Sequence, residues 1–149
     1  MRNLFLALAC LFITNVATAQ FSPVRWSFTA EKVSDKEYDI VITADIAHGW
    51  SVYSQYLESD DGPVKTKFEF EKNEHLQLIG NTKEIGHKKE KFDELFGMTL
   101  IKFSKKVKFT QRVKVTNKKQ PVSGFLTYMT CDETSCLPPT DVDFTVALP

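Results

Sequence analysis

The segment that decides the fold is Tyr38-Asp39-Ile40-Val41-Ile42-Thr43-Ala44-Asp45-Ile46, in which apolar and polar side chains alternate. Val41 is the one apolar residue that falls among the polar positions. A stripe of period two with one polar side is typical of an antiparallel strand that covers a core on one face. We therefore expect a sheet that packs a core on one face and contacts solvent on the other.

Similar short segments recur along the chain, separated by turn sequences such as Glu58–Pro63 and Asn117–Pro121. No long segment shows a helical period. About eight or nine short strands at regular spacing predict an all-β fold, and we expect an immunoglobulin-like antiparallel β-sandwich. The widely separated Cys…Trp…Cys pattern of antibody domains does not occur. Besides Tyr38–Ile46, the expected strands are Val24–Ala30, Trp50–Tyr53, Phe68–Phe70, Leu76–Ile79, Thr99–Phe103, Val107–Val115, Val122–Met129 and Val142–Leu148.

The segment from Gly86 to Gly97 does not fit this pattern clearly. A charged run comes first, and Phe92, Leu95 and Phe96 then follow at helical spacing. One helical turn and an irregular loop are equally consistent with it, and a charged run of this kind is usually a solvated surface.

The N-terminus predicts a signal peptide over residues 1–19. Arg2 gives a positive start, an apolar run covers Leu4–Ile13, and Ala17-Thr18-Ala19 fits a cleavage site. The run is too short to span a membrane, and Cys10 at its centre resembles a lipoprotein signal only faintly. We expect one domain over residues 20–149, in the periplasm, with no transmembrane segment after cleavage. The 19 basic and 19 acidic residues cancel, so nothing indicates binding to nucleic acid or an anionic membrane.

Cys131 and Cys136 are then the only cysteines of the expected domain. A disulfide between them closes a loop worth only about 2 kcal/mol in the chain-entropy model, against about 4.7 kcal/mol for a 100-residue loop. The spacing alone leaves a structural staple and a redox-active pair about equally favoured. The adjacent Asp132 and Glu133 should raise the pKa of a neighbouring thiol. A redox-active pair here should therefore depend on its partner for activation.

A metal site is the third alternative for these cysteines. Cys131, Cys136 and Met129, with one of the histidines, offer soft ligands for copper(I) or zinc. The spacing matches no standard zinc module, and no histidine lies near the cysteines in sequence. The histidines in question are His48, His75 and His87.

The motif Tyr128-x-x-Cys131-x4-Cys136-x-Pro138-Pro139 resembles that of the N-terminal periplasmic domain of the thiol:disulfide interchange protein DsbD, a protein-disulfide reductase. The segments Gly49–Tyr53, Asp61–Pro63 and Asp93–Gly97 extend the resemblance upstream. It implies an immunoglobulin-like domain without a bound cofactor. Its disulfide would take electrons from a membrane-embedded thiol donor and pass them to periplasmic thioredoxin-like proteins through mixed disulfides.

Carried over to this chain, the resemblance makes Cys136 the cysteine bonded to the partner and Cys131 its resolving mate. Asp93 and Glu94 would lie near the sulfurs and handle protons, while Leu95 and Phe96 would shield the disulfide. Trp50, Tyr53 and Tyr128 would surround the site. The four-residue spacing is shorter than in the best-known members, and the fused membrane and thioredoxin-like domains of the family do not follow in this sequence. An immunoglobulin-like interaction module with a structural disulfide is therefore the alternative.

Overall fold

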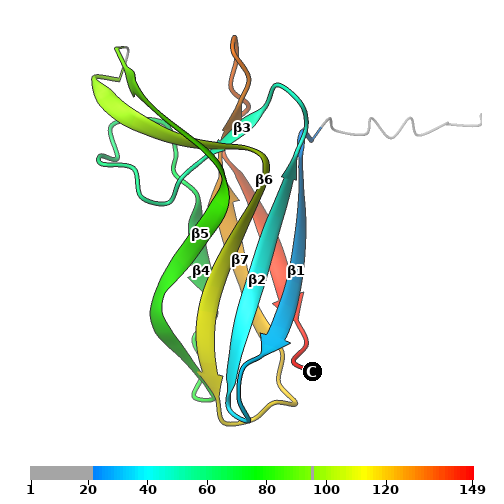
Figure 1. Ribbon diagram of the computed structural model, residues 1–149. Helices are drawn as coiled ribbons and strands as arrows, with labels where there is room; N and C mark the ends of the chain where they lie inside the picture. Colours follow the sequence, from blue (N-terminus) through cyan, green and yellow to red (C-terminus); the bar gives the residue numbers. More distant parts are fainter. Residues whose placement is uncertain (1–21, 95) are drawn as a thin grey trace, which may run out of the picture.

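The protein is built from β-strands, as the alternation predicts. The computed structural model describes residues 22–94 and 96–149, and within these ranges it contains nine strands and no helix (Figure 1). The expected signal peptide, with Cys10, and Leu95 lie outside the described residues. The strands are β1 Val24–Lys32, β2 Glu37–Ile46, β3 Ser51–Tyr53, β4 Lys67–Phe70, β5 Leu76–Asp93, β6 Met98–Val115, β7 Val122–Tyr128, β8 Thr130–Cys131 and β9 Thr140–Val146.

Two antiparallel sheets form an immunoglobulin-like sandwich, which confirms the predicted fold class. One sheet has the order β1-β2-β6-β3-β8, with β5 paired to the other edge of β6, and the second has the order β4-β7-β9. The core between them takes Ile40 and Ile42 from β2, Phe109 from β6 and Leu126 from β7, all fully buried. Among the described residues no helix is long and apolar enough to cross a membrane.

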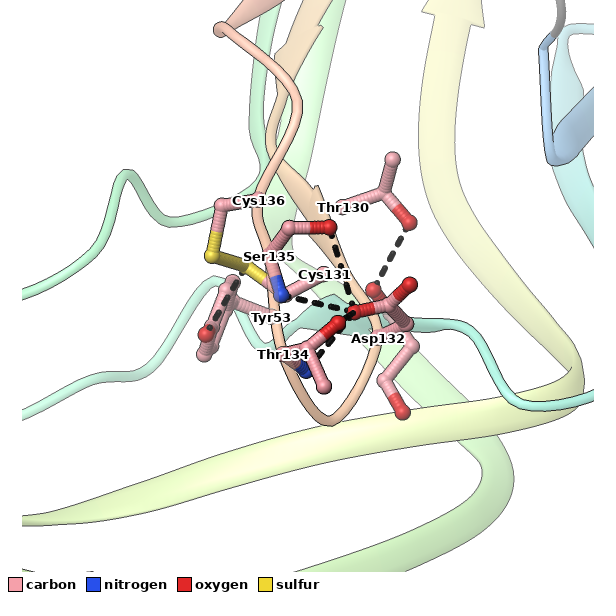
Figure 2. Close-up of a disulfide and its surroundings, with 8 residues drawn as sticks. Tyr53, Thr130, Cys131, Asp132, Thr134, Ser135 and Cys136 are labelled. Carbon is pink, nitrogen blue, oxygen red and sulfur yellow. Dashed lines mark hydrogen bonds between the residues drawn. A yellow bond between two sulfur atoms is a disulfide. The ribbon is translucent and has the colours of Figure 1, made fainter.

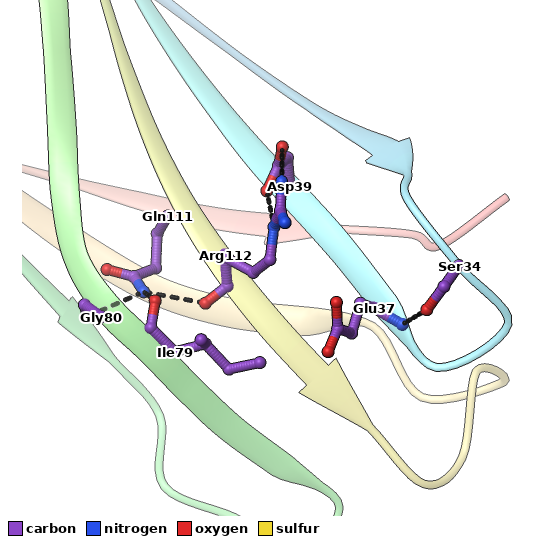
Figure 3. Close-up of polar contacts among 7 residues, drawn as sticks. All are labelled: Ser34, Glu37, Asp39, Ile79, Gly80, Gln111 and Arg112. Carbon is purple, nitrogen blue, oxygen red and sulfur yellow. Dashed lines mark hydrogen bonds and ion pairs between the residues drawn. The ribbon is translucent and has the colours of Figure 1, made fainter.

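Two adjacent polar residues of β6, Gln111 and Arg112, make hydrogen bonds to the strands on either side of it. Arg112 donates two hydrogen bonds to the Asp39 carboxylate across the β2–β6 pair, at 2.7 and 2.9 Å (Figure 3). Gln111 is buried although it is polar, and its Nε2 donates to the carbonyl oxygens of Ile79 and Arg112. Gln111 therefore supplies hydrogen bonds where the pairing of β5 with β6 shifts register between Ile79 and Lys83.

Strand β5 corrects two predictions. The expected strand at Leu76–Ile79 does not end at Gly80, and the segment from Gly86 onward is neither a helical turn nor a loop as far as Asp93. Both belong to one 18-residue strand that pairs with β6 along its length, and among the described residues after it Glu94, Phe96 and Gly97 lie in the turn. Cross-strand pairing has overridden the local signals here, with bulges that absorb the interruptions.

Strand β6 is a single 18-residue strand where the sequence predicts two. It bends at Lys105, whose φ of 64° lies in the left-handed region. Before the bend β6 pairs with β3, and after it β6 pairs with β2. Gly86 lies at the inside of the bend, where a Cβ would stand 2.6 Å from the carbonyl oxygen of Lys106. The bend brings the first half of β6, with β5 alongside, next to β3 and β8.

Candidate functional site

The two cysteines form a disulfide across a tight turn that projects from one end of the sandwich. Cys131 ends β8, which pairs with β3 so that Cys131 lies opposite Ser51. The chain turns through residues 132–135, and Cys136 returns opposite Cys131 as an isolated β-bridge. The sulfurs are 2.06 Å apart and the Cα atoms 4.0 Å apart (Figure 2). The spacing of four residues is thus the length of the turn itself.

Asp132 organises this turn. Its Oδ1 accepts hydrogen bonds from the backbone N–H groups of Thr134 and Ser135, at 2.8 and 2.7 Å, and from both of their hydroxyls (Figure 2). The backbone N–H donors, above all that of Thr134, lower the pKa of the Asp132 carboxyl. The carboxylate therefore has a structural role in holding the turn closed between the cysteines.

The disulfide lies on the outer face of the large sheet, opposite the main core. Val52 of β3 and Phe103 of β6 point into the main core, whereas their neighbours in sequence point the other way. The outward side chains form a second, smaller apolar cluster around the sulfur of Cys131. Its members are Tyr53, Leu57, Met98, Leu100 and Cys131.

The two sulfurs differ in environment. Cys131 is only 4% exposed, and its Sγ accepts a hydrogen bond of 3.2 Å from the hydroxyl of Tyr53 (Figure 2). Cys136 is exposed. Burial, and to a smaller extent the nearby Asp93 carboxylate, raises the pKa of Tyr53, so its phenol stays a proton donor at neutral pH. One end of the disulfide is therefore open to attack, and the other is enclosed beside a fixed hydrogen-bond donor.

Tyr53 is held in place on several sides. Its backbone carbonyl accepts a 2.6 Å hydrogen bond from the buried Thr66 hydroxyl. The ammonium group of Lys102, directly opposite on β6, lies 5.2 Å from the centre of the Tyr53 ring. This is a cation–π distance.

The long connection from β3 to β4 closes one side of the cluster. Glu84 of β5 accepts hydrogen bonds from the Ser54 hydroxyl and from the backbone N–H of Gln55, which ties the start of the connection to the sheet. Leu57 then reaches the cluster around Cys131. Further along, Gly62 lies so close to Met98 that a Cβ would stand 2.7 Å from its sulfur.

The acidic-aromatic segment expected to cap the site is the tip of the β5–β6 hairpin. Asp93 is the last residue of β5, and its Oδ1 accepts a 3.3 Å hydrogen bond from the N–H of Phe96. Glu94 is exposed, and Phe96 is 39% exposed. Figure 1 shows the hairpin tip and the cysteine turn as separate projections at the same end of the molecule. Cys136 is exposed beside the described residues of the tip.

Two other predicted site residues lie on the core side of the sheet. Tyr128 is buried in the main core, edge-on to Trp26 at a ring-centroid distance of 5.1 Å. Trp50 is half-buried and packs against the same core. The structure thus brings Tyr53 to the sulfur of Cys131 and places Trp50 and Tyr128 among the core residues.

Leu57, Met98 and Leu100 are site residues that the sequence reasoning missed. Met98 and Leu100 alternate with Thr99 and Ile101, so the period of two could have placed them on one face. Leu57 lies in a mixed segment without a period, and only the tertiary structure brings it to Cys131. In residues 22–94 and 96–149, no three His, Cys, Asp or Glu side chains gather closely enough to hold a metal ion.

Comparisons with known proteins identify a matching family and solved structures with a similar fold. The family described as "Thiol:disulfide interchange protein DsbD, N-terminal" matches residues 18–148. The solved N-terminal domain of Neisseria meningitidis DsbD in the reduced form is 22% identical, with a TM-score of 0.54 and 83% of each chain covered. The N-terminal periplasmic domain of ScsB from Proteus mirabilis is 19% identical with a TM-score of 0.56; the match covers 84% of this chain and 45% of that one. No curated protein sequence matches significantly.

Proposed function

Because the chain belongs to the N-terminal-domain family of the thiol:disulfide interchange protein DsbD, we propose that its Cys131–Cys136 disulfide exchanges electrons with thioredoxin-like proteins. Family membership and the disulfide together support thiol–disulfide exchange as the general chemistry. The observation that carries the detailed proposal is the difference between the sulfurs, because Cys136 is exposed and Cys131 is enclosed.

In the first step a partner thiolate attacks Sγ of Cys136. A bond forms between the partner sulfur and Cys136, the Cys131–Cys136 bond breaks, and Cys131 leaves as a thiolate. The leaving group is the sulfur that already accepts a hydrogen bond from Tyr53, so developing negative charge meets a donor that needs no rearrangement. Because a well-stabilised leaving thiolate departs faster, this geometry favours attack at Cys136 over attack at Cys131.

The second step resolves the mixed disulfide. A second thiol of the partner attacks the partner's own sulfur, Cys136 leaves as a thiolate, and the partner departs oxidised while this domain holds the dithiol. Two electrons have then moved to Cys131 and Cys136. Passing them on reverses the roles, because the Cys136 thiolate attacks a target disulfide and the Cys131 thiolate displaces the reduced target. No bound cofactor enters either step.

We further propose that the tip of the β5–β6 hairpin, residues 93–97, regulates access to Cys136. Its base adjoins the site, since Met98 and Leu100 follow the tip on β6 and belong to the apolar cluster around Cys131. Movement of the tip toward the cysteine turn would let Leu95 and Phe96 cover the sulfur. Asp93, which already acts electrostatically on Tyr53, is the carboxylate best placed to exchange protons there.

The proposed compartment is the periplasm, with a membrane-embedded thiol protein as electron donor. Support for export comes from the apolar run Leu4–Ile13 and the Ala17-Thr18-Ala19 sequence, which together fit a signal peptide cleaved before Gln20. N-terminal sequencing of the exported protein should give Gln20 as the first residue. A protein that keeps residues 1–19 would contradict this part of the proposal.

The order of attack is tested with single-cysteine variants. Cys131→Ser leaves the accessible Cys136 thiol and should trap a mixed disulfide with a thioredoxin-like protein, whereas Cys136→Ser should trap little. The reverse pattern would exchange the two roles. The function itself is tested by the reduction potential of the pair, which we expect between about −120 and −270 mV. A value below about −300 mV would identify a structural disulfide instead.

A further inference from the structure

Three lysines lie on the same face of the sheet as the disulfide, beside the cluster around Cys131. In the β5–β6 pair Lys89 lies directly opposite Lys102, and Lys91 lies opposite Leu100, a member of that cluster. Side chains that are directly opposite in an antiparallel pair share a face. On the other edge of β6, Tyr53 of β3 lies opposite Lys102, so the same face continues onto β3. Cys131, in the same cluster as Tyr53, continues this face onto β8.

Repulsion among these lysines lowers the stability of the fold when no partner is bound. Like charges directly opposite each other on neighbouring strands are destabilising, and Lys89 and Lys102 are such a pair. Among the described residues no ion pair relieves Lys89, Lys91 or Lys102, although Lys88, on the other face of β5, pairs with Glu90. Lys89 and Lys91 are exposed. Their positive charge is thus directed to solvent, and it lies on the face where Cys131 and Tyr53 meet.

We propose that Lys89, Lys91 and Lys102 form a docking surface for an acidic patch on the protein that exchanges thiols with Cys136. This proposal rests on the exchange function proposed above and specifies the surface chemistry of the partner. Adjacent strands are about 4.8 Å apart, so β5 lies roughly 14 Å from β8, three strands away. A standard interface covers about 800 Å² per partner, a disc of about 16 Å radius. A partner centred on the disulfide therefore covers Lys102 and brings its rim close to Lys89 and Lys91, which lie further along the strands than Cys131.

The charges on the opposite side of the disulfide orient such a partner. Asp132 and the exposed Glu133 lie in the cysteine turn, whereas the lysines lie across Tyr53 from it. Asp93 shares the lysine face at the end of β5, opposite Met98. An acidic patch on the partner is attracted by the lysines of β5 and β6 and repelled by the carboxylates of the cysteine turn. These two forces together set the orientation in which the partner docks over the disulfide. Such complementarity acts on the association rate and on partner choice.

The test uses two peptides of equal length, each with one cysteine, flanked by glutamates in one and by lysines in the other. The rate of mixed-disulfide formation at Cys136 is measured at about 10 mM ionic strength, where the Debye length is about 30 Å, and is expressed per thiolate. For Lys89→Glu with Lys91→Glu, we expect the ratio of the glutamate-peptide rate to the lysine-peptide rate to fall about 10-fold or more, and to recover toward wild type at 0.5 M salt.

The matched variant is Lys118→Glu with Lys119→Glu, which makes the same charge change in the β6–β7 connection at the opposite end of the sandwich (Figure 1). It should leave the ratio within about twofold of wild type. Lys89→Gln with Lys91→Gln should give an intermediate ratio and covers the case in which charge reversal disturbs the fold. An equal change in both charge-reversal variants, or none in either, would overturn the docking surface. Uncharged dithiothreitol should reduce all variants equally; if it reduces none, the exchange function itself fails and this proposal with it.

Discussion

The hydroxyl of Tyr53 donates a hydrogen bond to Sγ of Cys131 from the neighbouring strand, over 3.2 Å. Both residues are almost fully buried, so water does not compete for this contact. A donor fixed in a region of low polarity stabilises a negative charge more than the same donor in water does. The Tyr53 hydroxyl is thus the donor that a thiolate developing on Cys131 would meet.

Tyr53→Phe removes this donor and keeps the ring. Hydrogen bonds to charged groups contribute about 1.5–3 kcal/mol, so the pKa of the reduced Cys131 thiol should rise by about one to two units. Reduction of the disulfide by dithiothreitol should slow about 3- to 10-fold, because the leaving thiolate loses its stabilisation. Stopped-flow kinetics and thiol alkylation against pH measure the two effects.

Tyr56→Phe is the matched change, since the Tyr56 hydroxyl binds the Thr82 carbonyl and not a sulfur. It should leave the thiol pKa and the reduction rate at their wild-type values. If both variants slow reduction equally, the effect comes from packing of the β3–β4 connection, and the role of Tyr53 as donor to sulfur is wrong.

Asp132→Ala should make the disulfide easier to reduce. The four hydrogen bonds to the Asp132 carboxylate close the turn between the cysteines, so they raise the effective concentration of one thiol beside the other. Without them the equilibrium with glutathione should shift toward the dithiol by about 3- to 10-fold, or ~15–30 mV. Asp132→Asn, which keeps an acceptor oxygen, should shift it less, and Glu133→Ala least. An Asn variant as strongly shifted as Ala would refute the turn argument.

The same contact predicts a pH dependence. The pKa of Asp132 is lowered in the folded protein, so its contribution to stability is fully present above the unfolded value near 3.8. It is lost as the pH falls below that value and through the folded pKa. The protection of the Thr134 and Ser135 amides, taken relative to the intrinsic exchange rate at each pH, should therefore fall selectively below about pH 4. Unchanged protection of these amides at pH 2.5, with the rest of the sheet intact, would contradict the prediction.

The sequence predicted the sandwich because a buried strand must alternate, and Tyr38–Ile46 does so almost without exception. It could not predict the lengths of β5 and β6. Gly80, Gly86 and the lysine-rich run look like interruptions locally, and only the pairing of the two strands with each other overrides them. Tertiary pairing of this kind leaves no periodic signal in either strand alone.

For the site, the sequence predicted the cysteine pair, and the family resemblance added Tyr53. The separate cluster around Cys131 was not predictable, because its members come from β3, β6, β8 and the β3–β4 connection. Trp50 and Tyr128, in contrast, were expected to surround the site, but they lie among the core residues. They flank the site residues in sequence, yet alternation turns them toward the core.

Gly86→Ala should destabilise the fold at the bend of the β5–β6 hairpin. The new Cβ would stand 2.6 Å from the Lys106 carbonyl oxygen and 2.9 Å from the Cα of Val107, both backbone atoms that cannot move independently. Overpacking of this kind costs about 1–3 kcal/mol, which urea denaturation can measure. Because the bend carries Met98 and Leu100 to Cys131, the disulfide should also become more accessible to small thiols. A variant as stable as wild type would show that the two strands can separate at this point without loss.

Leu95→Gly and Phe96→Gly should each speed reduction of the disulfide by a small thiol, if the hairpin tip covers Cys136 part of the time. Removing an apolar side chain from the tip weakens the covered form, so Cys136 is exposed for a larger fraction of the time. The gain is bounded by the covered fraction; a tip that covers the sulfur nine-tenths of the time permits about a 10-fold increase. Val33→Gly makes a comparable change at an exposed apolar residue in the β1–β2 turn and should have no effect. Equal rates for wild type and both tip variants, measured with dithiothreitol under identical conditions, would remove the gating role and leave Cys136 permanently accessible.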